Sequence, residues 1–109
     1  MKLELKAKPI SVNQVWQGRR FKTKLYKDYE IEISWLLKKY RGQIRGEIEI
    51  HYTFYIKNYS RTDCDNLVKP IQDILVKNGI IEDDRKIIYF SAEKIKSNIE
   101  KIEIEIYKI

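Results

Sequence analysis

The stretch Glu47 to Ile56, EIEIHYTFYI, alternates strictly between two kinds of side chain and constrains the fold more than any other feature of the sequence. Successive side chains of a strand point to opposite faces, so this pattern predicts a strand with one buried face. That face carries Ile48, Ile50, Tyr52, Phe54 and Ile56. His51 falls on the polar face and is interpreted as an ordinary strand position. A chain built around such a strand must cover one side of a sheet.

Three other segments also read as strands. Lys2 to Lys8 alternates in the same way, and Pro9 ends it. Near the C-terminus, strands are expected at about Ile87 to Ile95 and at Glu100 to Tyr107. Because Ser97-Asn98 is turn-prone, we expect these last two strands to form a hairpin.

Two segments have helical spacing. Thr23 is placed to cap a helix that runs to about Tyr40, with the cations Lys38, Lys39 and Arg41 near its end and Gly42 as a stop. Leu67 to Leu75 predicts a short second helix that Asp65 or Asn66 caps and Gly79 ends. Pro70 predicts a kink or a late start.

The order of these segments is strand, helix, strand, helix, strand, strand. With 109 residues and no linker or repeat, the chain fits one domain spanning residues 1–109. The expected class is α+β, with a small mixed sheet and two helices packed on it.

The composition indicates which partners and which cellular location to expect. The net charge of +6 favours a polyanion such as nucleic acid, although solubility explains it equally well. One cysteine, Cys64, and one histidine exclude an internal disulfide and a structural zinc site, so reducing cytoplasm is the expected location. No apolar run is long enough for a membrane span.

Ser11 to Lys22 mixes cations with aromatic residues and has no clear period, so we expect a basic loop. Arg19, Arg20 and Lys22 suit phosphate contacts, and Trp16 suits base stacking. The alternative is that Trp16 and Phe21 anchor the loop to the core.

Ser60 to Ile88 gathers carboxylates around one short helix. Asp63 and Asp65 come first, Asp73 lies within the helix, and Asp83 and Asp84 follow it. If Asp63 and Asp65 stand in extended backbone, they point to the same side, where a divalent cation would relieve their repulsion. Mg²⁺ suits carboxylate oxygens together with water and phosphate, and Mn²⁺ is the alternative ion.

Lys69 follows Asp65 by four residues. Its ammonium could approach a metal-bound phosphate, although an ion pair with Asp73 is the simpler role. Asp84 or Asp83 could reach the same metal if the second helix folds back. Carboxylates with a lysine are a recurring set for metal-assisted phosphodiester hydrolysis. A calcium EF-hand is excluded because its glycine and its twelfth-position glutamate are missing.

The combination of Asp63-Cys64-Asp65-Asn66, Lys69, Asp73, Gly79 and Asp83-Asp84 resembles the RusA family of Holliday junction resolvases. Ser11-Val12-Asn13, the chain length and the element order are similar too. One departure is Thr62, where the family often carries arginine directly before the first aspartate; Arg61 stands one residue earlier.

The resemblance implies a homodimeric, Mg²⁺-dependent endonuclease that nicks two opposing strands of a four-way DNA junction. By position, Asp63, Asp65 and Asp84 would be the catalytic metal ligands and Lys69 the essential lysine, with Asp73 and Asp83 in support. The expected DNA-binding residues are Asn13, Trp16, Arg19, Arg20, Lys22 and Arg61. A two-fold dimer would place one site at each scissile phosphate.

Two other functions remain open from the sequence. The first is a basic DNA-binding module without catalysis, whose carboxylates only cap and solvate helix ends. The second is a metal-dependent nuclease acting on other nucleic acids, including RNA.

Overall fold

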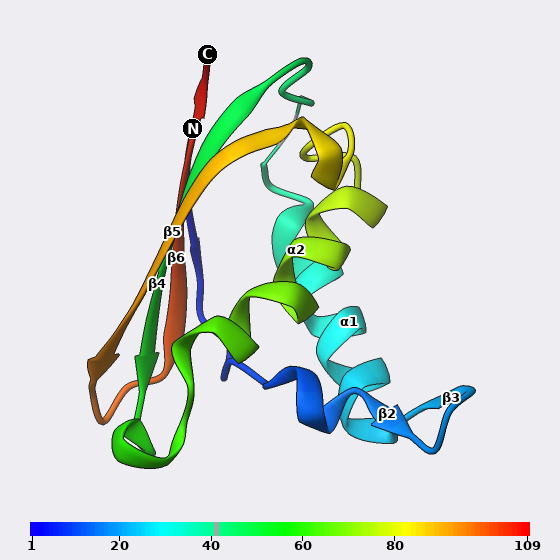
Figure 1. Cartoon of the computed structure of the whole chain (residues 1–109), viewed down its shortest axis with the longest axis vertical. Coiled ribbons are helices and arrows are strands. Elements are labelled where there is room, and N and C mark those ends of the chain that lie inside the picture. The colour runs from blue at the N-terminus through cyan, green and yellow to red at the C-terminus, as the bar shows by residue number, and fades with distance from the viewer. Residues whose placement is uncertain (41) are drawn as a thin grey trace.

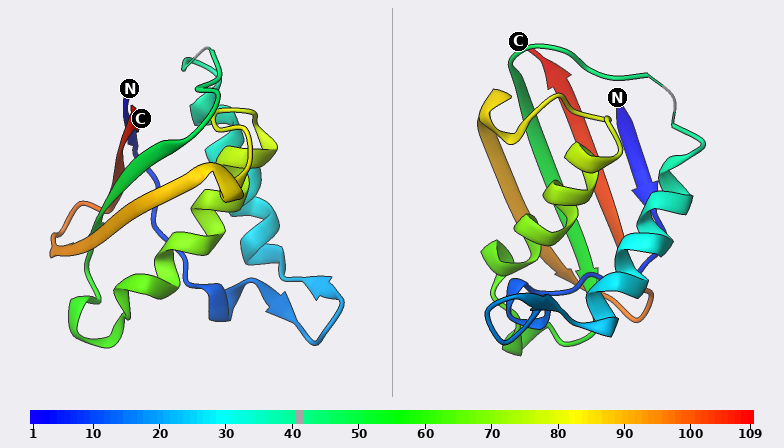
Figure 2. Two further views of the ribbon diagram at one scale, coloured as in Figure 1. Left: turned by 45° about the horizontal axis from the view of Figure 1, so that its top comes forward. Right: turned by 90° about the vertical axis from the view of Figure 1, so that its right-hand side faces the viewer.

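The computed structural model describes residues 1–40 and 42–109, so the expected position of Arg41 lies outside the described residues. One sheet has the strand order β1-β6-β4-β5, made of β1 (Lys2–Leu5), β4 (Ile48–Ile56), β5 (Ile87–Lys96) and β6 (Lys101–Lys108). Helices α1 (Lys24–Leu37) and α2 (Val68–Lys77) both cover the same face of this sheet (Figures 1 and 2). The expected mixed sheet with two packed helices is confirmed.

The alternation of β4 is borne out residue by residue. Its side chains switch between buried and half-buried along the whole strand, and Ile48, Ile50 and Phe54 are fully buried beneath the helices. On the opposite face, His51 Nδ1 lies 2.6 Å from Ser91 Oγ and its Nε2 lies 2.8 Å from Glu49 Oε2. His51 therefore links β4 to β5 on the open face of the sheet.

The expected hairpin between the last two strands is wrong. β4 lies between them, pairing in parallel with β5 and antiparallel with β6. Helix α2 is the crossover that returns the chain beside β4, and this leaves the other edge of β4 free for β6. The connection at 97–100 passes the end of β4, where Ser97 N donates to Ile56 O over 2.9 Å.

The two helices begin and end close to their expected limits. Thr23 caps α1, accepting from Tyr26 N at 3.1 Å, and the helix ends at Leu37, before the expected Tyr40. Helix α2 starts late, at Val68, so that buried Pro70 lies in its first turn, where no intrahelical N–H partner is lost. Neither Asp65 nor Asn66 caps it, because both belong to the preceding 3-10 turn.

The expected loop Ser11 to Lys22 contains regular structure. A 3-10 turn (Val12–Gln14) leads into a two-stranded hairpin of β2 (Trp16–Gln17) and β3 (Phe21–Lys22). Gly18 turns the hairpin with φ of +72°, a conformation that glycine adopts without steric cost. The first strand is also shorter than expected, because its pairing with β6 stops at Leu5. None of the described helices is long and apolar enough to cross a membrane.

Candidate nuclease site

The stretch Ser60 to Ile88, called here the acidic segment, begins shortly after the end of β4. A 3-10 turn (Tyr59–Arg61), two extended residues and a second 3-10 turn (Cys64–Leu67) carry the chain directly into α2. Lys94 of β5 fixes this path, since its ammonium donates to Tyr59 O at 2.6 Å and to Thr62 O at 2.9 Å. The same ammonium lies 4.2 Å from the centre of the Tyr59 ring. Lys94 thus holds the backbone immediately before Asp63.

Lys94 was not among the residues expected at the site. What marks Lys94 is its place in the sheet: it lies on the inward-facing side of β5, in register with buried Phe54 of β4. Such a position calls for a polar partner, which the carbonyls of the Asp63 segment supply.

Asp63 and Asp65 do not occupy one extended segment, so the expectation that they point to the same side on that ground is wrong. Asp63 is extended, with φ of −80° and ψ of 125°, whereas Asp65 lies inside the second 3-10 turn. The turn forms because Asn66 N donates to Asp63 O at 3.2 Å and Val68 N donates to Asp65 O. Both carboxylates are exposed.

Lys69 joins the two halves of the acidic segment. Its Nζ lies 2.8 Å from Asp73 Oδ1, one turn along α2, and 3.4 Å from Asp84 Oδ2 in the 3-10 turn Asp84–Lys86 after the helix. The hydrogen bond to Asp73, above all, raises the pKa of Lys69 above its usual value. Lys69 is therefore a cation at neutral pH. The ion pair with Asp73 expected from the sequence is confirmed, and the contact with Asp84 is an additional one that the sequence did not predict.

Asp83 is engaged by the backbone. Its carboxylate caps the turn Asp84–Lys86 by accepting from Arg85 N at 2.9 Å, and it also contacts the Arg85 guanidinium at 3.3 Å. The backbone hydrogen bond from Arg85 is the largest of the influences that lower the pKa of Asp83 to about 2. The geometry gives Asp83 a structural task and leaves Asp84 to face Lys69.

The three carboxylates expected to bind metal are not gathered into one cluster. Among residues 1–40 and 42–109, no group of three or more His, Cys, Asp or Glu side chains is arranged to hold a metal ion. The chemistry of the donors still fits Mg²⁺, because this ion often takes only one or two carboxylates together with water and substrate phosphate. Exposed Asp63, Asp65 and Asp84 supply such oxygens.

The hairpin of β2 and β3, called here the basic hairpin, projects its aromatic residues into solvent. Trp16 is 49% exposed and Phe21 71%, so neither anchors the hairpin to the core; Val15, 6% exposed, does so. Lys22 Nζ lies 5.7 Å from the centre of the Trp16 ring and 4.6 Å from that of Tyr26. Arg19 and Arg20 lie at the exposed turn of the hairpin.

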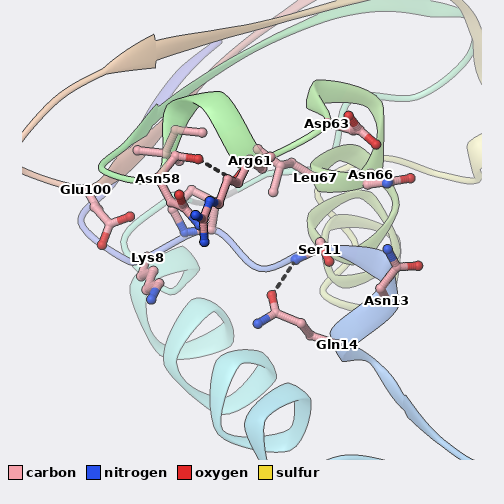
Figure 3. A pocket seen from close by; sticks show the side chains of 13 residues that line it. Lys8, Ser11, Asn13, Gln14, Asn58, Arg61, Asp63, Asn66, Leu67 and Glu100 are labelled. Carbon is pink, nitrogen blue, oxygen red and sulfur yellow. Dashed lines mark hydrogen bonds between the residues drawn. The ribbon is translucent and has the colours of Figure 1, made fainter.

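Two pockets border the acidic segment, and most of the expected residues line one or the other. The first, of about 270 Å³, is called here the amide pocket (Figure 3). Its lining comprises Lys8, Pro9, Ser11, Asn13, Gln14, Ile56, Asn58, Arg61, Thr62, Asp63, Asn66, Leu67 and Glu100. The second, of about 240 Å³, is called the aromatic pocket and is lined by Val12, Val15, Trp16, Lys22, Tyr26, Lys69, Pro70 and Asp73.

The turn Val12–Gln14 contributes to both pockets and so connects the basic hairpin with the acidic segment. The amide pocket brings Asn13 and Arg61 beside Asp63, and the aromatic pocket brings Trp16 and Lys22 beside Lys69. Arg19 and Arg20 line neither pocket. Asp65, Asp83 and Asp84 also lie outside both pockets.

The sequence of the chain is similar to those of known proteins. A family model described as "Endodeoxyribonuclease RusA" matches residues 6–107. The chain is 29% identical over 92 residues to a protein of Aquifex aeolicus named crossover junction endodeoxyribonuclease RusA, covering 82% of this chain and 73% of that protein. It is 40% identical over 50 residues to a Lactococcus phage r1t protein with the same enzyme name, covering 46% of this chain and 38% of the phage protein.

Proposed function

The chain belongs to the RusA family of endodeoxyribonucleases, and from this premise we propose that it resolves four-way DNA junctions by Mg²⁺-dependent paired nicks. The observation that carries the proposal is the family match over residues 6–107. The matched residues include Lys69, Asp73 and Asp84, whose side chains are in contact. The names of the relatives supply the junction, and the carboxylates and lysine supply the chemistry.

The proposed division of labour follows from the contacts. Lys69 lies beside the carboxylate of Asp84 and remains protonated, so it can neutralise charge on a phosphate bound there. Asp63, Asp65 and Asp84 would supply the one or two carboxylates that hold Mg²⁺ beside water and substrate phosphate, and the ion would activate water and stabilise the leaving oxygen. Asp73 restrains the lysine from the next turn of α2, while Asp83 and Lys94 hold the two backbone segments that carry the carboxylates.

The distribution of charge supports DNA binding on the helical side of the molecule. The open face of the sheet carries Glu49, Glu93, Glu103 and Glu105 together with Lys2 and Lys101. The basic hairpin lies on the helical side of the sheet (Figure 1), where Trp16 and Lys22 line a pocket with Lys69. Phosphate contacts from the hairpin would give affinity that falls with salt and carries little sequence information. Binding of the cation would then let the DNA phosphate approach the carboxylates.

The proposal includes a homodimer, because a four-way junction presents two equivalent phosphates. Strand β5 is an edge of the sheet and leaves Ile88, Tyr89 and Phe90 about half exposed, which suits pairing with a second chain. Ile88→Asp should shift the sedimentation coefficient to that of a 13.2 kDa monomer and should uncouple the two nicks. A variant that still sediments as a dimer would exclude this edge as the interface.

The site assignment is tested by removing one carboxylate at a time. Asp63→Asn and Asp84→Asn should abolish nicking of a synthetic junction in Mg²⁺, while junction binding stays the same or improves. Asp28→Asn is the matched control, since Asp28 is an exposed aspartate that pairs with Lys24 at 2.7 Å on α1. Undiminished cleavage by both site variants would refute the assignment.

The absence of a three-carboxylate cluster from the described residues favours one alternative, a DNA-binding module without catalysis. This alternative predicts junction or duplex binding with no cleavage in Mg²⁺ or Mn²⁺. Offering RNA beside DNA in the same assay separates a nuclease of broader substrate range.

A further inference from the structure

We propose that the amide pocket binds one unpaired base of the DNA, next to the phosphate that is cut. This inference rests on the proposed function, and it adds a binding site for a part of the substrate other than that phosphate. Asp63, an expected metal ligand, lines the pocket, so a base held there belongs to a nucleotide adjoining the site. The volume of about 270 Å³ is just below the range of about 300–1,000 Å³ that is typical of small-molecule sites, and so suits a ligand of base size.

The walls of the pocket suit a flat heterocycle. Pro9, Ile56 and Leu67 are buried and give it an apolar floor for the face of a ring. Arg61 extends over the middle of the pocket, between Ser11 and the loop at Asn58 (Figure 3). Its planar guanidinium is suited to stacking on a base, as arginine does in other nucleic-acid sites.

The polar rim of the pocket suits the edge of a base. Amide side chains of Asn13, Asn58 and Asn66 each offer both a donor and an acceptor, and none of them hydrogen-bonds another group in the part of the chain described. The edge of a base presents donors and acceptors side by side, so paired amide groups can meet both.

A base explains the rim better than a second phosphate does. The carboxylates of Glu100 and Asp63 offset the charges of Lys8 and Arg61 in the lining, so the pocket carries no excess of positive charge that would select a phosphate. One oxygen of Glu100 accepts from Lys57 N at 3.3 Å, which leaves its other oxygen to accept from the amino group of a base. We therefore infer a preference for bases that carry an exocyclic amino group.

Such a pocket would also contribute to selection of the substrate. Withdrawing a base from a duplex costs a few kcal/mol, and least where the base is already unpaired. At the branch point the strands exchange partners, so a base there has continuous duplex on one side only and is easier to withdraw than a base within an arm. A pocket beside the cut phosphate would therefore favour junctions over intact duplex.

The first experiment measures base extrusion without cleavage. A four-way junction carries 2-aminopurine on one side of the cut phosphate, then on the other. Fluorescence is read on protein binding in Ca²⁺, which takes carboxylate oxygens as Mg²⁺ does, and a gel of the same samples checks that the DNA stays uncut. Wild-type protein should raise the fluorescence severalfold at one of the two positions. Asn58→Trp, which fills the pocket, should leave it at the level of free DNA, and Glu47→Gln, an exposed position before β4, should behave as wild type.

The second experiment tests whether the effect of a pocket variant on the cleavage rate depends on the presence of the base. Asn58→Trp should cut the intact junction at least tenfold more slowly than wild type in Mg²⁺, whereas the two proteins should cut a junction lacking that base at equal rates. Glu100→Gln should slow cleavage only when the base carries an amino group. Because the variant is compared with wild type on both junctions, a loss of rate that depends on the base is separated from a general loss of activity.

The outcomes separate this inference from the proposed function. Wild-type protein that cuts no four-way junction refutes the proposed function. Wild-type protein that cuts junctions but leaves 2-aminopurine dark at both positions refutes the pocket. Equal loss of rate for Asn58→Trp on both junctions refutes it as well, because the tryptophan would then act on the enzyme and not on the base.

Discussion

Lys69 offers the sharpest test of the chemistry, because α2 contains a second lysine in nearly the same setting. Lys69 pairs with Asp73 at 2.8 Å and Lys77 pairs with Glu30 at 2.7 Å. Their side chains are 54% and 64% exposed, so the two ammonium groups are similarly solvated. Only Lys69 has the further contact with Asp84. Substituting each by methionine keeps the length and the helix propensity while it removes the charge.

The two variants should lose little stability and differ greatly in activity. An exposed ion pair contributes about 0.2–1 kcal/mol, which corresponds to a fall of at most about 8 °C in the unfolding temperature of a domain this small. Removing one preorganised group that stabilises developing charge typically costs about 100- to 1,000-fold in rate. Lys69→Met should therefore show that loss, and Lys77→Met should stay within about threefold of wild type.

The assay is single-turnover nicking of a labelled synthetic junction at saturating protein, with unfolding temperatures measured in parallel. Saturating protein removes differences in DNA affinity from the comparison. If Lys69→Met and Lys77→Met nick at equal rates while both remain folded, Lys69 serves only to pair with its helix, and its assigned role at the phosphate is refuted.

Three further predictions concern buried hydroxyl groups, the cap at Asp83 and the charge of the hairpin. Tyr29 Oη is buried without a hydrogen-bond partner in the described part of the chain, so Tyr29→Phe should leave the free energy of unfolding unchanged or raise it. Tyr52→Phe removes a 3.0 Å hydrogen bond to Gln72 and should lower that free energy by about 0.5–1.5 kcal/mol. Urea unfolding measures both. The folded-state pKa of Asp83, about 2, lies below its usual 3.8, so the stabilisation from its carboxylate is present above pH 3.8 and is lost as the pH falls toward 2. The unfolding temperature of Asp83→Asn should therefore fall less than that of wild type between pH 3.8 and pH 2. An equal fall in the two proteins would contradict the cap. Replacing Arg19 and Arg20 together by glutamine should reduce the slope of log affinity against log salt by about 2, and an unchanged slope would remove the hairpin from the DNA contact.

Short-range rules account for most of the elements. The alternation from Glu47 to Ile56 predicts β4 and its buried face because the helices cover only one side of the sheet. Thr23 begins α1 as expected, since its hydroxyl accepts from Tyr26 N. Pro70 fits the start of α2 because the first turn has no N–H bond to lose.

The order of the strands does not follow from such rules. Nothing local to residues 97–100 records that β4 will stand between β5 and β6, because that depends on the crossover through α2. A turn-prone dipeptide predicts that the chain reverses and not which strand it meets next. The contact of His51 with Ser91 depends on the same parallel pairing.

The site divides in the same way. The carboxylates and Lys69 are recognisable from spacing, and the pairing of Lys69 with Asp73 follows from their positions four residues apart on a helix. The 3-10 turn that separates Asp63 from Asp65 is not encoded by a capping motif, so the extended geometry assumed for them fails. The hold of Lys94 on Thr62 joins residues 32 apart in sequence and needs the folded sheet.

The central claim is tested most directly by cleavage of a four-way junction against matched duplex and flap DNA, with and without Mg²⁺. The proposed function predicts symmetric paired nicks in the junction, only when Mg²⁺ is present, and intact duplex and flap. Equal cutting of all three substrates would contradict resolution of junctions while leaving a nuclease. Binding of the junction without any cut in Mg²⁺ would contradict catalysis itself.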